Sequence, residues 1–583
     1  MPLNIPLKRY WDLLAKHIAS QKLPFALLTV LLFSSIGLQI FNPQIMRRFI
    51  DATQSAAAPS VLVSTAALFI GLAIMQQGVT IGAAYFGENV AWTATNALRA
   101  ELARHCIHLD MSFHGETSPG ELIERIDGDV GELANFFSQL VIRVIGNLIL
   151  LVGIVVALFL EDWRLGVAVF IFAIVALLAL NAVRGLAIPH QTAFRQAVAD
   201  LFGFLEERLA GTEDIRSSGA VDFVLRGLYQ LQYRGLTHWR KREQMFMIVR
   251  IVGGALMMTA HVMAMIGGFL LFRADLVTIG AVYLIVHYVN LLGRPIRELT
   301  QQAESLQSVG AATQRLSDLS RIRSKLTDGP GAMIPPGPLT LTFDHVHFSY
   351  IDEEPVLKDI AFELAPGRIL GLLGRTGSGK TTMARLIFRL FDPKQGAIRL
   401  KGVDIRQPRL KELRQRVALV TQDVQLFQAT VRDNLTFFDP TISDARIAEV
   451  IEALELTEWY ASLPEGLDTR LATGGRSLSA GEGQLLAFTR VFLRDPGLVI
   501  LDEASSRLDP ATEQLIERAV DKLLKDRSAI VIAHRLGTVH RADEIMILQD
   551  GEVAEHGERL ALAADPRSRF AALLQAGLEE VLV

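Results

Sequence analysis

The sequence predicts two parts of different fold class: an α-helical membrane domain with six transmembrane helices, followed by an α/β domain. Three observations support this prediction. Long apolar runs fill the chain up to about residue 300, a proline- and glycine-rich stretch follows, and β-branched runs then alternate with helix-like segments towards the C-terminus. Alternating strands and helices favour a parallel sheet with helices on both faces.

The overall composition agrees with a membrane protein. The chain has 583 residues, 50% of them hydrophobic, and its mean hydropathy of +0.31 is too high for an ordinary soluble enzyme. This length predicts more than one domain. The formal net charge of −4 gives no reason to expect a nucleic-acid partner. The single cysteine, Cys106, excludes an intrachain disulfide framework and fits soluble parts in a reducing compartment.

The apolar runs predict six transmembrane helices, because a hydrocarbon core of ~30 Å needs roughly 20 apolar residues in a helix. The N-terminal region lacks the pattern of a removable signal peptide, so we expect the first apolar run to be a full span. The sixth run is short and carries His287 and Asn290. The predicted spans cover residues 23–45, 61–86, 140–160, 165–188, 251–272 and 277–296.

Charge around the spans predicts their orientation. Two long polar connections, between spans two and three and between spans four and five, alternate with short turns. Basic residues gather in the N-terminal flank and in the second long connection, so the N-terminus and both long connections are predicted to be cytoplasmic. Arg47 and Arg48 oppose this orientation locally. We expect an integral, multi-pass protein of a bacterial inner (cell) membrane, with long connections that extend the membrane helices into the cytosol.

A linker is predicted between the two parts. The stretch TDGPGAMIPPGP, residues 327–338, interrupts every regular pattern with proline and glycine. We therefore expect a membrane domain at residues 1–320, a linker at 321–338 and the α/β domain at 339–583.

A glycine-rich loop follows the strand-like run ILGLL in the α/β part. The sequence GRTGSGKTT fits the pattern G-x-x-x-x-G-K-[ST]. Its glycines permit a tight turn that points backbone N–H groups at phosphate oxygens, and the following helix adds the positive end of its dipole. Lys380 is expected to reach the β- and γ-phosphates, and Thr381 to help hold Mg²⁺. The candidate phosphate-binding residues are Gly374, Arg375, Thr376, Gly377, Ser378, Gly379, Lys380, Thr381 and Thr382.

Two acids end a second strand-like run. LVILDE, residues 498–503, has four apolar residues before Asp502 and Glu503, as expected for a buried parallel strand. Acids at the carboxyl end of such a strand lie where ligands bind in open α/β sheets. Asp502 is expected to hold Mg²⁺ through water, and Glu503 to polarise the attacking water in phosphoryl transfer.

With these motifs, the chain resembles an ABC transporter half of the six-helix exporter type, with one fused nucleotide-binding domain, over essentially its whole length. The resemblance implies that Tyr350 stacks on adenine and that Gln422 touches Mg²⁺ and senses the membrane domain. It implies that His534 is the switch histidine near the γ-phosphate. The loop that joins the two ATP sites is matched by Ser506, Arg507, Leu508 and Asp509.

The segment RSLSAGEGQLLAFTR, residues 476–490, resembles the family signature with two changes. Leu478, Ser479 and Gly481 match, whereas Ala480 and Glu482 stand where the family usually has glycine and glutamine. The resemblance implies that two nucleotide-binding domains close head to tail over two ATP molecules. Each site then combines the phosphate loop of one chain with the signature of the other, where Ser479 and the backbone at Gly481 donate to the γ-phosphate.

The changed signature predicts a weakened site for the ATP held by the partner. Ala480 adds a methyl group near a tight backbone approach, and Glu482 places an acid close to a polyanion. Thr473 and Gly474 also replace a usual Glu–Arg pair. Since Glu503 is present, we favour a heterodimer with a second half-transporter that lacks the catalytic base, while a homodimer with a tolerated variant signature stays open.

The resemblance implies ATP-driven export or flipping of a hydrophobic or amphipathic substrate across the bilayer, with Mg²⁺ as cofactor. It also implies that each long connection docks a short transverse helix on a nucleotide-binding domain, near residues 111–115 and 217–223. An ATP-gated channel or regulator is the alternative, and uncoupled ion flux distinguishes it. Six spans argue against a soluble ABC-type ATPase that acts on nucleic acid. Polar residues in the spans either line a substrate path or bond helices together; they include Gln39, Gln76, Gln77, Asn147, His261, His287 and Asn290.

Overall fold

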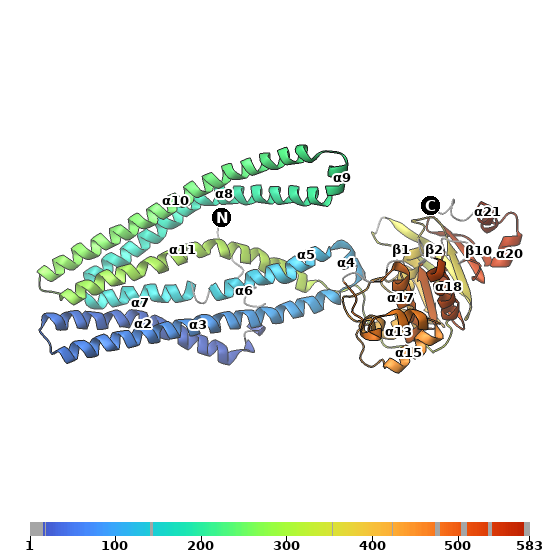
Figure 1. Cartoon of the computed structure of the whole chain (residues 1–583), viewed down its shortest axis with the longest axis horizontal. Helices are drawn as coiled ribbons and strands as arrows, with labels where there is room; N and C mark the ends of the chain where they lie inside the picture. The colour runs from blue at the N-terminus through green and yellow to red at the C-terminus, as the bar shows by residue number, and fades with distance from the viewer. Residues whose placement is uncertain are drawn as a thin grey trace. The chain divides into compact units, whose positions relative to one another are not determined.

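The computed structural model describes residues 15–17, 19–139, 144–351, 354–421, 424–472, 478–502, 510–533 and 539–576. The described residues form two compact units (Figure 1). The first contains the chain up to Ile107 together with Pro119–Ile322, and the second contains His108–Ser118 together with the chain from Arg323 onward. Residues of the first long connection therefore belong with the α/β part.

Long helices make up the first unit. Among the described residues, five helices are long and apolar enough to cross a membrane: α2 (Lys22–Gln54), α3 (Pro59–Ile107), α8 (Trp163–Ala210), α10 (Val221–Arg273) and α11 (Ile279–Arg321), the last through its first half. A shorter apolar helix, α7 (Gly146–Glu161), lies in the third predicted span, whose residues 140–143 fall outside the described part. The helical membrane domain is confirmed, and the count of six spans stays a prediction.

The membrane helices continue beyond their apolar segments, as their periodicity predicted. Helices α8 and α10 contain 48 and 53 residues, which at ~1.5 Å per residue is about two and a half times the length that a bilayer core needs. Figure 1 shows this pair running side by side, with α9 (Thr212–Ser217) at its end. The expected short helix near residues 217–223 thus lies slightly earlier, because Gly219 takes a left-handed turn (φ 63°) and α10 has begun at Val221.

Shorter helices follow α3. They are α4 (Met111–Glu116), α5 (Pro119–Ile123), the π-helix η1 (Glu124–Asp129) and α6 (Val130–Gln139). Helix α4 falls on the first expected transverse helix, and the Asp110 side chain caps it by accepting the N–H groups of Ser112 and Phe113. The other carboxylate oxygen of Asp110 accepts the N–H of Lys325. One buried side chain therefore joins α4 to the chain that enters the α/β domain.

Arg47, which opposed the orientation rule, has acidic partners. Its guanidinium donates to both carboxylate oxygens of Glu161 at 2.5 and 2.6 Å, and its Nε lies 3.7 Å from Asp51. Asp51 also accepts the N–H of Gly280 and the hydroxyl of Thr278, each at 2.9 Å. Pairing of this kind lowers the cost of a charge at the end of a membrane helix.

Two sheets build the second unit. The six-stranded sheet has the order β10-β9-β3-β8-β7-β6, and the four-stranded sheet has the order β2-β1-β4-β5. Neighbours among β9, β3, β8, β7 and β6 are parallel, whereas β10 and all pairs of the smaller sheet are antiparallel. The bounds are β1 Leu341–Ser349, β2 Pro355–Leu364, β3 Ile369–Leu373, β4 Gln395–Leu400, β5 Val403–Asp404, β6 Val417–Val420, β7 Leu498–Asp502, β8 Ser528–Ile532, β9 Glu544–Gln549 and β10 Glu552–Glu558.

The prediction of a parallel sheet holds for the strands of the motifs but is wrong for the first strand. The first of the β-branched runs, at residues 339–350, contains β1, and β1 pairs antiparallel with β2 and β4 instead of joining the parallel strands. The physical reason is the short connection between β1 and β2, since a parallel pair needs a crossover of about a dozen residues or more.

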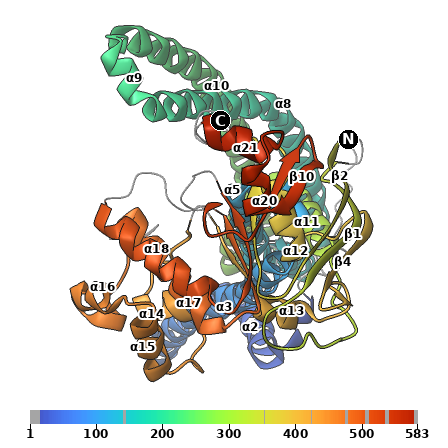
Figure 2. The ribbon, with the colours of Figure 1, turned by 90° about the vertical axis from the view of Figure 1, so that its right-hand side faces the viewer.

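Side chains of the parallel strands point alternately into two cores. In β7, Leu498 and Ile500 pack in a core with α12 (Lys380–Ile387) and the four-stranded sheet. Val499 and Leu501 pack in a second core with α17 (Ala480–Arg494) and α18 (Pro510–Leu524). Figure 2 shows α17 and α18 on one side and β1, β2 and β4 on the other. This period of two confirms the expected helices on both faces.

Further helices surround these cores. They are α13 (Leu410–Arg416), α14 (Val431–Thr436), α15 (Asp444–Ala453), α16 (Thr457–Ser462), η3 (Gly466–Asp468), α20 (Arg559–Ala564) and α21 (Arg569–Ala576).

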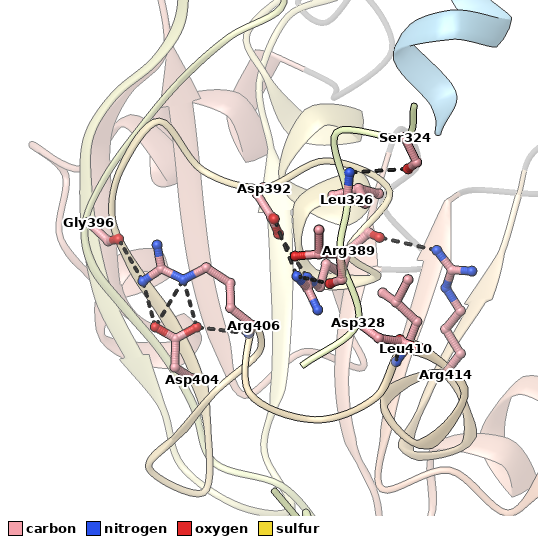
Figure 3. A network of polar contacts seen from close by, with 11 residues as sticks. Ser324, Leu326, Asp328, Arg389, Asp392, Gly396, Asp404, Arg406, Leu410 and Arg414 are labelled. Atoms are coloured by element: carbon pink, nitrogen blue, oxygen red, sulfur yellow. Dashed lines mark hydrogen bonds and ion pairs between the residues drawn. The ribbon is translucent and has the colours of Figure 1, made fainter. Parts of the chain in front are cut away.

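Residues of the predicted linker form hydrogen bonds with other residues of the second unit. The carbonyl of Thr327 accepts from the buried Arg389 at 2.9 Å, and the Asp328 side chain accepts the N–H of Leu410 at 2.8 Å (Figure 3). Asp392 in turn accepts from Nε of Arg389 at 2.8 Å. Proline and glycine therefore end regular secondary structure here, while side-chain and backbone hydrogen bonds hold the segment in place.

Candidate nucleotide-binding site

The glycine-rich loop lies between β3 and α12, and its backbone requires glycine. Gly374, Gly377 and Gly379 have φ angles of 146°, 84° and 107°. A Cβ atom on Gly374 would lie 2.3 Å from the carbonyl oxygen of Leu548, and one on Gly379 would lie 2.5 Å from a methyl carbon of Leu357. Conformation and space therefore both exclude a side chain at these two positions.

Lys380 folds back over this loop. Its amine donates to the carbonyl of Gly374 and to that of Arg375, and only 6% of the residue is exposed. Burial lowers the pKa of Lys380, and the negative charge of Asp502 opposes this shift. The Ser378 hydroxyl is buried and has no hydrogen-bond partner in the described part of the chain. A phosphate group fits this arrangement, because its oxygens accept from both side chains and from the loop N–H groups.

Tyr350 lies against the helix that follows the loop. Its hydroxyl is 3.2 Å from Oγ1 of Thr382, and it accepts from Arg385 at 3.2 Å. The residue is 43% exposed, and its ring packs edge-on against Phe348 and Phe391. A partly exposed aromatic ring beside a phosphate loop fits a stacking platform for a nucleotide base.

The parallel strand order places Asp502 at the same sheet edge as the loop. Strand β8 lies between β3 and β7, so the carboxyl ends of these strands are neighbours. Asp502 ends β7 and is partly buried, and its charge acts on Lys380. Thr381 is exposed at the start of α12. A carboxylate and a hydroxyl are oxygen ligands of the kind that Mg²⁺ prefers.

Other predicted site residues lie outside the described part of the chain. They are Gln422, Thr473, Gly474, Glu503, Ser506, Arg507, Leu508, Asp509 and His534. In the sequence, Glu503 directly follows β7 and His534 comes two residues after β8. The roles of these residues stay predictions.

The signature segment begins helix α17 with a capping box. The Ser479 hydroxyl accepts the N–H of Glu482 at 3.2 Å, and the Glu482 carboxylate accepts the N–H of Ser479 at 2.7 Å. Leu478 packs against the core that includes α17 and α18, and Gly481 is buried in the first turn of α17. Glu482 therefore has a structural role that glutamine also performs. The pattern S-x-x-E was a local signal for it that our sequence analysis missed.

We expect Glu482→Ala to lower the free energy of unfolding by about 1 kcal/mol, because the Ser479 N–H loses its acceptor. Glu482→Gln keeps an acceptor oxygen and is expected to change the stability little. Thermal unfolding of the full chain in lipid nanodiscs measures both, with Glu452→Ala on the exposed face of α15 as the control. Equal melting temperatures for the alanine and glutamine variants would contradict the capping role.

Arg490 is a second residue that the sequence analysis did not identify. It is 8% exposed, and it donates to the Asn434 carbonyl at 2.6 Å, the Asn434 side-chain oxygen at 3.1 Å and the Gln425 carbonyl at 3.0 Å. Its guanidinium lies 4.5 Å from the centre of the Phe437 ring, and burial lowers the pKa of Arg490 to about 10. Arg490 thus joins the signature helix to residues 425–437. The sequence signal for it was an arginine between the apolar residues of α17.

Comparisons with known proteins agree with this geometry. A family described as the ABC transporter transmembrane region matches residues 25–296, and one described as ABC transporter matches residues 357–506. A putative multidrug export ATP-binding/permease protein of Bacillus subtilis (strain 168) is 30% identical over 526 residues, which cover 87% of each chain. An ATP-dependent lipid A-core flippase of Colwellia psychrerythraea is 28% identical over 576 residues, 94% of this chain and 93% of that protein.

A solved structure shares the fold. It is described as a bacterial Atm1-family ABC exporter with ATP bound, and it covers 96% of this chain and 98% of its own, with a TM-score of 0.78 and 23% sequence identity.

Proposed function

Because the chain belongs to the ABC transporter family, as a half-transporter of the exporter type, we propose that it uses ATP to export or flip a hydrophobic or amphipathic molecule across the membrane. One observation carries the proposal: the phosphate loop with its left-handed glycines and buried Lys380 shares a sheet edge with Asp502. In the same chain, a domain of long apolar helices precedes this site.

The chain's own residues supply the phosphate contacts. The loop N–H groups and Lys380 bind the β- and γ-phosphates, because phosphate oxygens accept charge-assisted bonds more strongly than the carbonyls that Lys380 now contacts. Thr381, Gln422 and Asp502, the last through water, would hold Mg²⁺. Tyr350 stacks on adenine. Glu503 polarises the attacking water, and His534 lies near the γ-phosphate; phosphoryl transfer depends on such positioning and charge neutralisation.

Each active site needs a second chain. One chain carries one phosphate loop and one signature, so the Ser479 hydroxyl and the Gly481 N–H act on ATP held by the partner. The capping box explains Glu482 structurally, but its charge still lies at the helix end that faces a polyanion. We therefore favour a heterodimer, with a homodimer as the other possibility.

Location and substrate class follow from the same features. Relatives from bacteria support a bacterial inner membrane, and the distribution of basic residues supports a cytoplasmic N-terminus and nucleotide-binding domain. Relatives described as a lipid A-core flippase and as a multidrug export protein support a lipid-like or hydrophobic substrate.

The test is Mg²⁺-dependent ATP hydrolysis by the full chain purified alone in lipid nanodiscs, with Glu503→Gln as the blank. Turnover that the variant abolishes supports the proposed function and shows that a homodimer suffices. Retained ATP binding with negligible turnover supports the heterodimer. If the changed signature is the cause of the low turnover, the double variant Ala480→Gly, Glu482→Gln is expected to restore hydrolysis. Absence of ATP binding would contradict the proposed function.

A further inference from the structure

One face of α11 is polar where this helix is apolar enough to cross the membrane. The apolar segment covers Ile279–Leu299. Its buried side chains pack in the core of the membrane domain; they are Leu284, Ile285, Tyr288, Val289, Leu292 and Ile296. At about 100° per residue, a second set of side chains lies within an arc of roughly 80° on the opposite side of the helix. This set, the polar stripe, consists of Tyr283, His287, Asn290, Arg294 and Arg297.

Four side chains of the polar stripe have no polar partner. Tyr283, Asn290 and Arg294 are exposed, and His287 is partly exposed. Within the described ranges of the chain, none of these four forms a hydrogen bond or an ion pair, although the rings of Tyr283 and His287 lie 5.8 Å apart. Polar groups that face hydrocarbon without a partner are costly. A path that holds water or a polar part of a substrate therefore suits the polar stripe.

Polar side chains between other membrane helices are paired. The hydroxyls of Ser35 on α2 and Thr80 on α3 lie 2.8 Å apart, and Gln44 on α2 donates to the Tyr288 hydroxyl at 3.1 Å. These pairs fit polar residues that join helices to one another. The contrast favours the other role, that of lining a substrate path, for the polar stripe.

Arg294 gives the polar stripe a positive charge. It lies five residues before the end of the apolar segment at Leu299, or about 7.5 Å along the helix. A guanidinium binds carboxylate and phosphate oxygens in bidentate geometry. Tyr283 lies about 16 Å further along the helix, which is about half of the ~30 Å hydrocarbon core. The polar stripe thus matches one leaflet in length, with a cation at one end and aromatic rings at the other.

We propose that the polar stripe lines the path of the transported molecule, and that this molecule is an anionic amphiphile of the membrane whose headgroup binds Arg294. The inference rests on the proposed function and narrows its substrate class. His287 and Asn290 donate and accept hydrogen bonds along the path. A stripe that only faced lipid would explain less, because a long arginine side chain reaches the headgroups but the short side chains of His287 and Asn290 do not.

Thiol labelling tests the environment of the polar stripe. Asn290→Cys is introduced into the full chain, and its dimeric fraction in phosphatidylcholine nanodiscs is labelled with a charged maleimide. Leu178→Cys, at a 65% exposed position of α8, is the control for a lipid-facing site, and the parent chain with its buried Cys106 gives the background. We expect Asn290→Cys to react about tenfold faster than Leu178→Cys, because the reactive thiolate forms in water. Equal rates would overturn the inference, since the stripe would then face lipid or a helix of the partner chain.

Lipid competition tests the substrate class. Palmitoyl-lysophosphatidylglycerol and palmitoyl-lysophosphatidylcholine, which share an acyl chain and differ in headgroup charge, are each titrated into the labelling reaction of Asn290→Cys. We expect the anionic lipid to protect the thiol. Arg294→Gln is expected to raise the half-protecting concentration about tenfold or more, the range of one charge-assisted hydrogen bond. Arg48→Gln, at an exposed arginine of α2, is the control and is expected to leave this concentration unchanged.

Two results of the competition would contradict the inference. Equal protection by both lipids would overturn the anionic class, and protection that survives Arg294→Gln would overturn the assigned contact. Both results leave the proposed function standing, because ATP binding and hydrolysis are measured separately. Absence of ATP binding would contradict the proposed function whatever the labelling shows.

Discussion

Lys380→Met is expected to reduce Mg²⁺-dependent ATP hydrolysis by about 10²–10³-fold, the usual effect of removing one group that stabilises charge in the transition state. The amine is buried over the loop, with Asp502 close enough to oppose the effect of burial on its pKa. Methionine matches the length of the lysine side chain but cannot neutralise the γ-phosphate charge that develops during transfer.

Steady-state ATPase assays of the full transporter in lipid nanodiscs measure this effect. Lys411→Met is the matched control, because Lys411 is exposed on α13 and outside the loop. The melting temperature of Lys380→Met is expected to stay near that of the wild type or to rise, since the variant removes a buried charge. Activity within threefold of the wild type would contradict the assignment of this loop as the phosphate site.

Arg490→Met is expected to lower the free energy of unfolding of the second unit by about 3–5 kcal/mol, because it leaves two buried acceptors on Asn434 and a partly buried acceptor on Gln425 without their charged donor. Those acceptors are the Asn434 carbonyl, the Asn434 side-chain oxygen and the Gln425 carbonyl. For a domain of this size the corresponding drop in melting temperature is roughly 6–20 °C.

Differential scanning fluorimetry of the full chain in nanodiscs measures the transition of the second unit. Arg494→Met provides a control on the same helix: Arg494 is exposed and lies 5.4 Å from the Phe437 ring, but it lacks the three hydrogen bonds of Arg490. A shift of less than 2 °C for Arg490→Met would show that the signature helix does not depend on this arginine.

Much of the fold was predictable because its signals are local. Apolar length predicts membrane helices, since insertion depends on a run of consecutive residues. Glycine and lysine spacing predicts the phosphate loop, since loop conformation depends on residues within one turn of each other. The capping box of Ser479 and Glu482 is an equally local signal. It was missed because Glu482 was compared only with the glutamine of the family signature.

Patterns along the chain are sufficient to predict the two-part organisation, the membrane helices that the structure confirms and the strand–loop–helix unit around Lys380. Tertiary structure alone decided which distant residues meet. Asp502 acts on Lys380 because β7, which Asp502 ends, and β3, which precedes the phosphate loop, both pair in parallel with β8, so that their carboxyl ends lie at one edge of the sheet. Glu161 pairs with Arg47, and Asp110 joins α4 to Lys325 across 215 residues of sequence. Hydropathy and periodicity act along the chain, whereas strand order and side-chain pairing bring together residues whose separation no local pattern encodes.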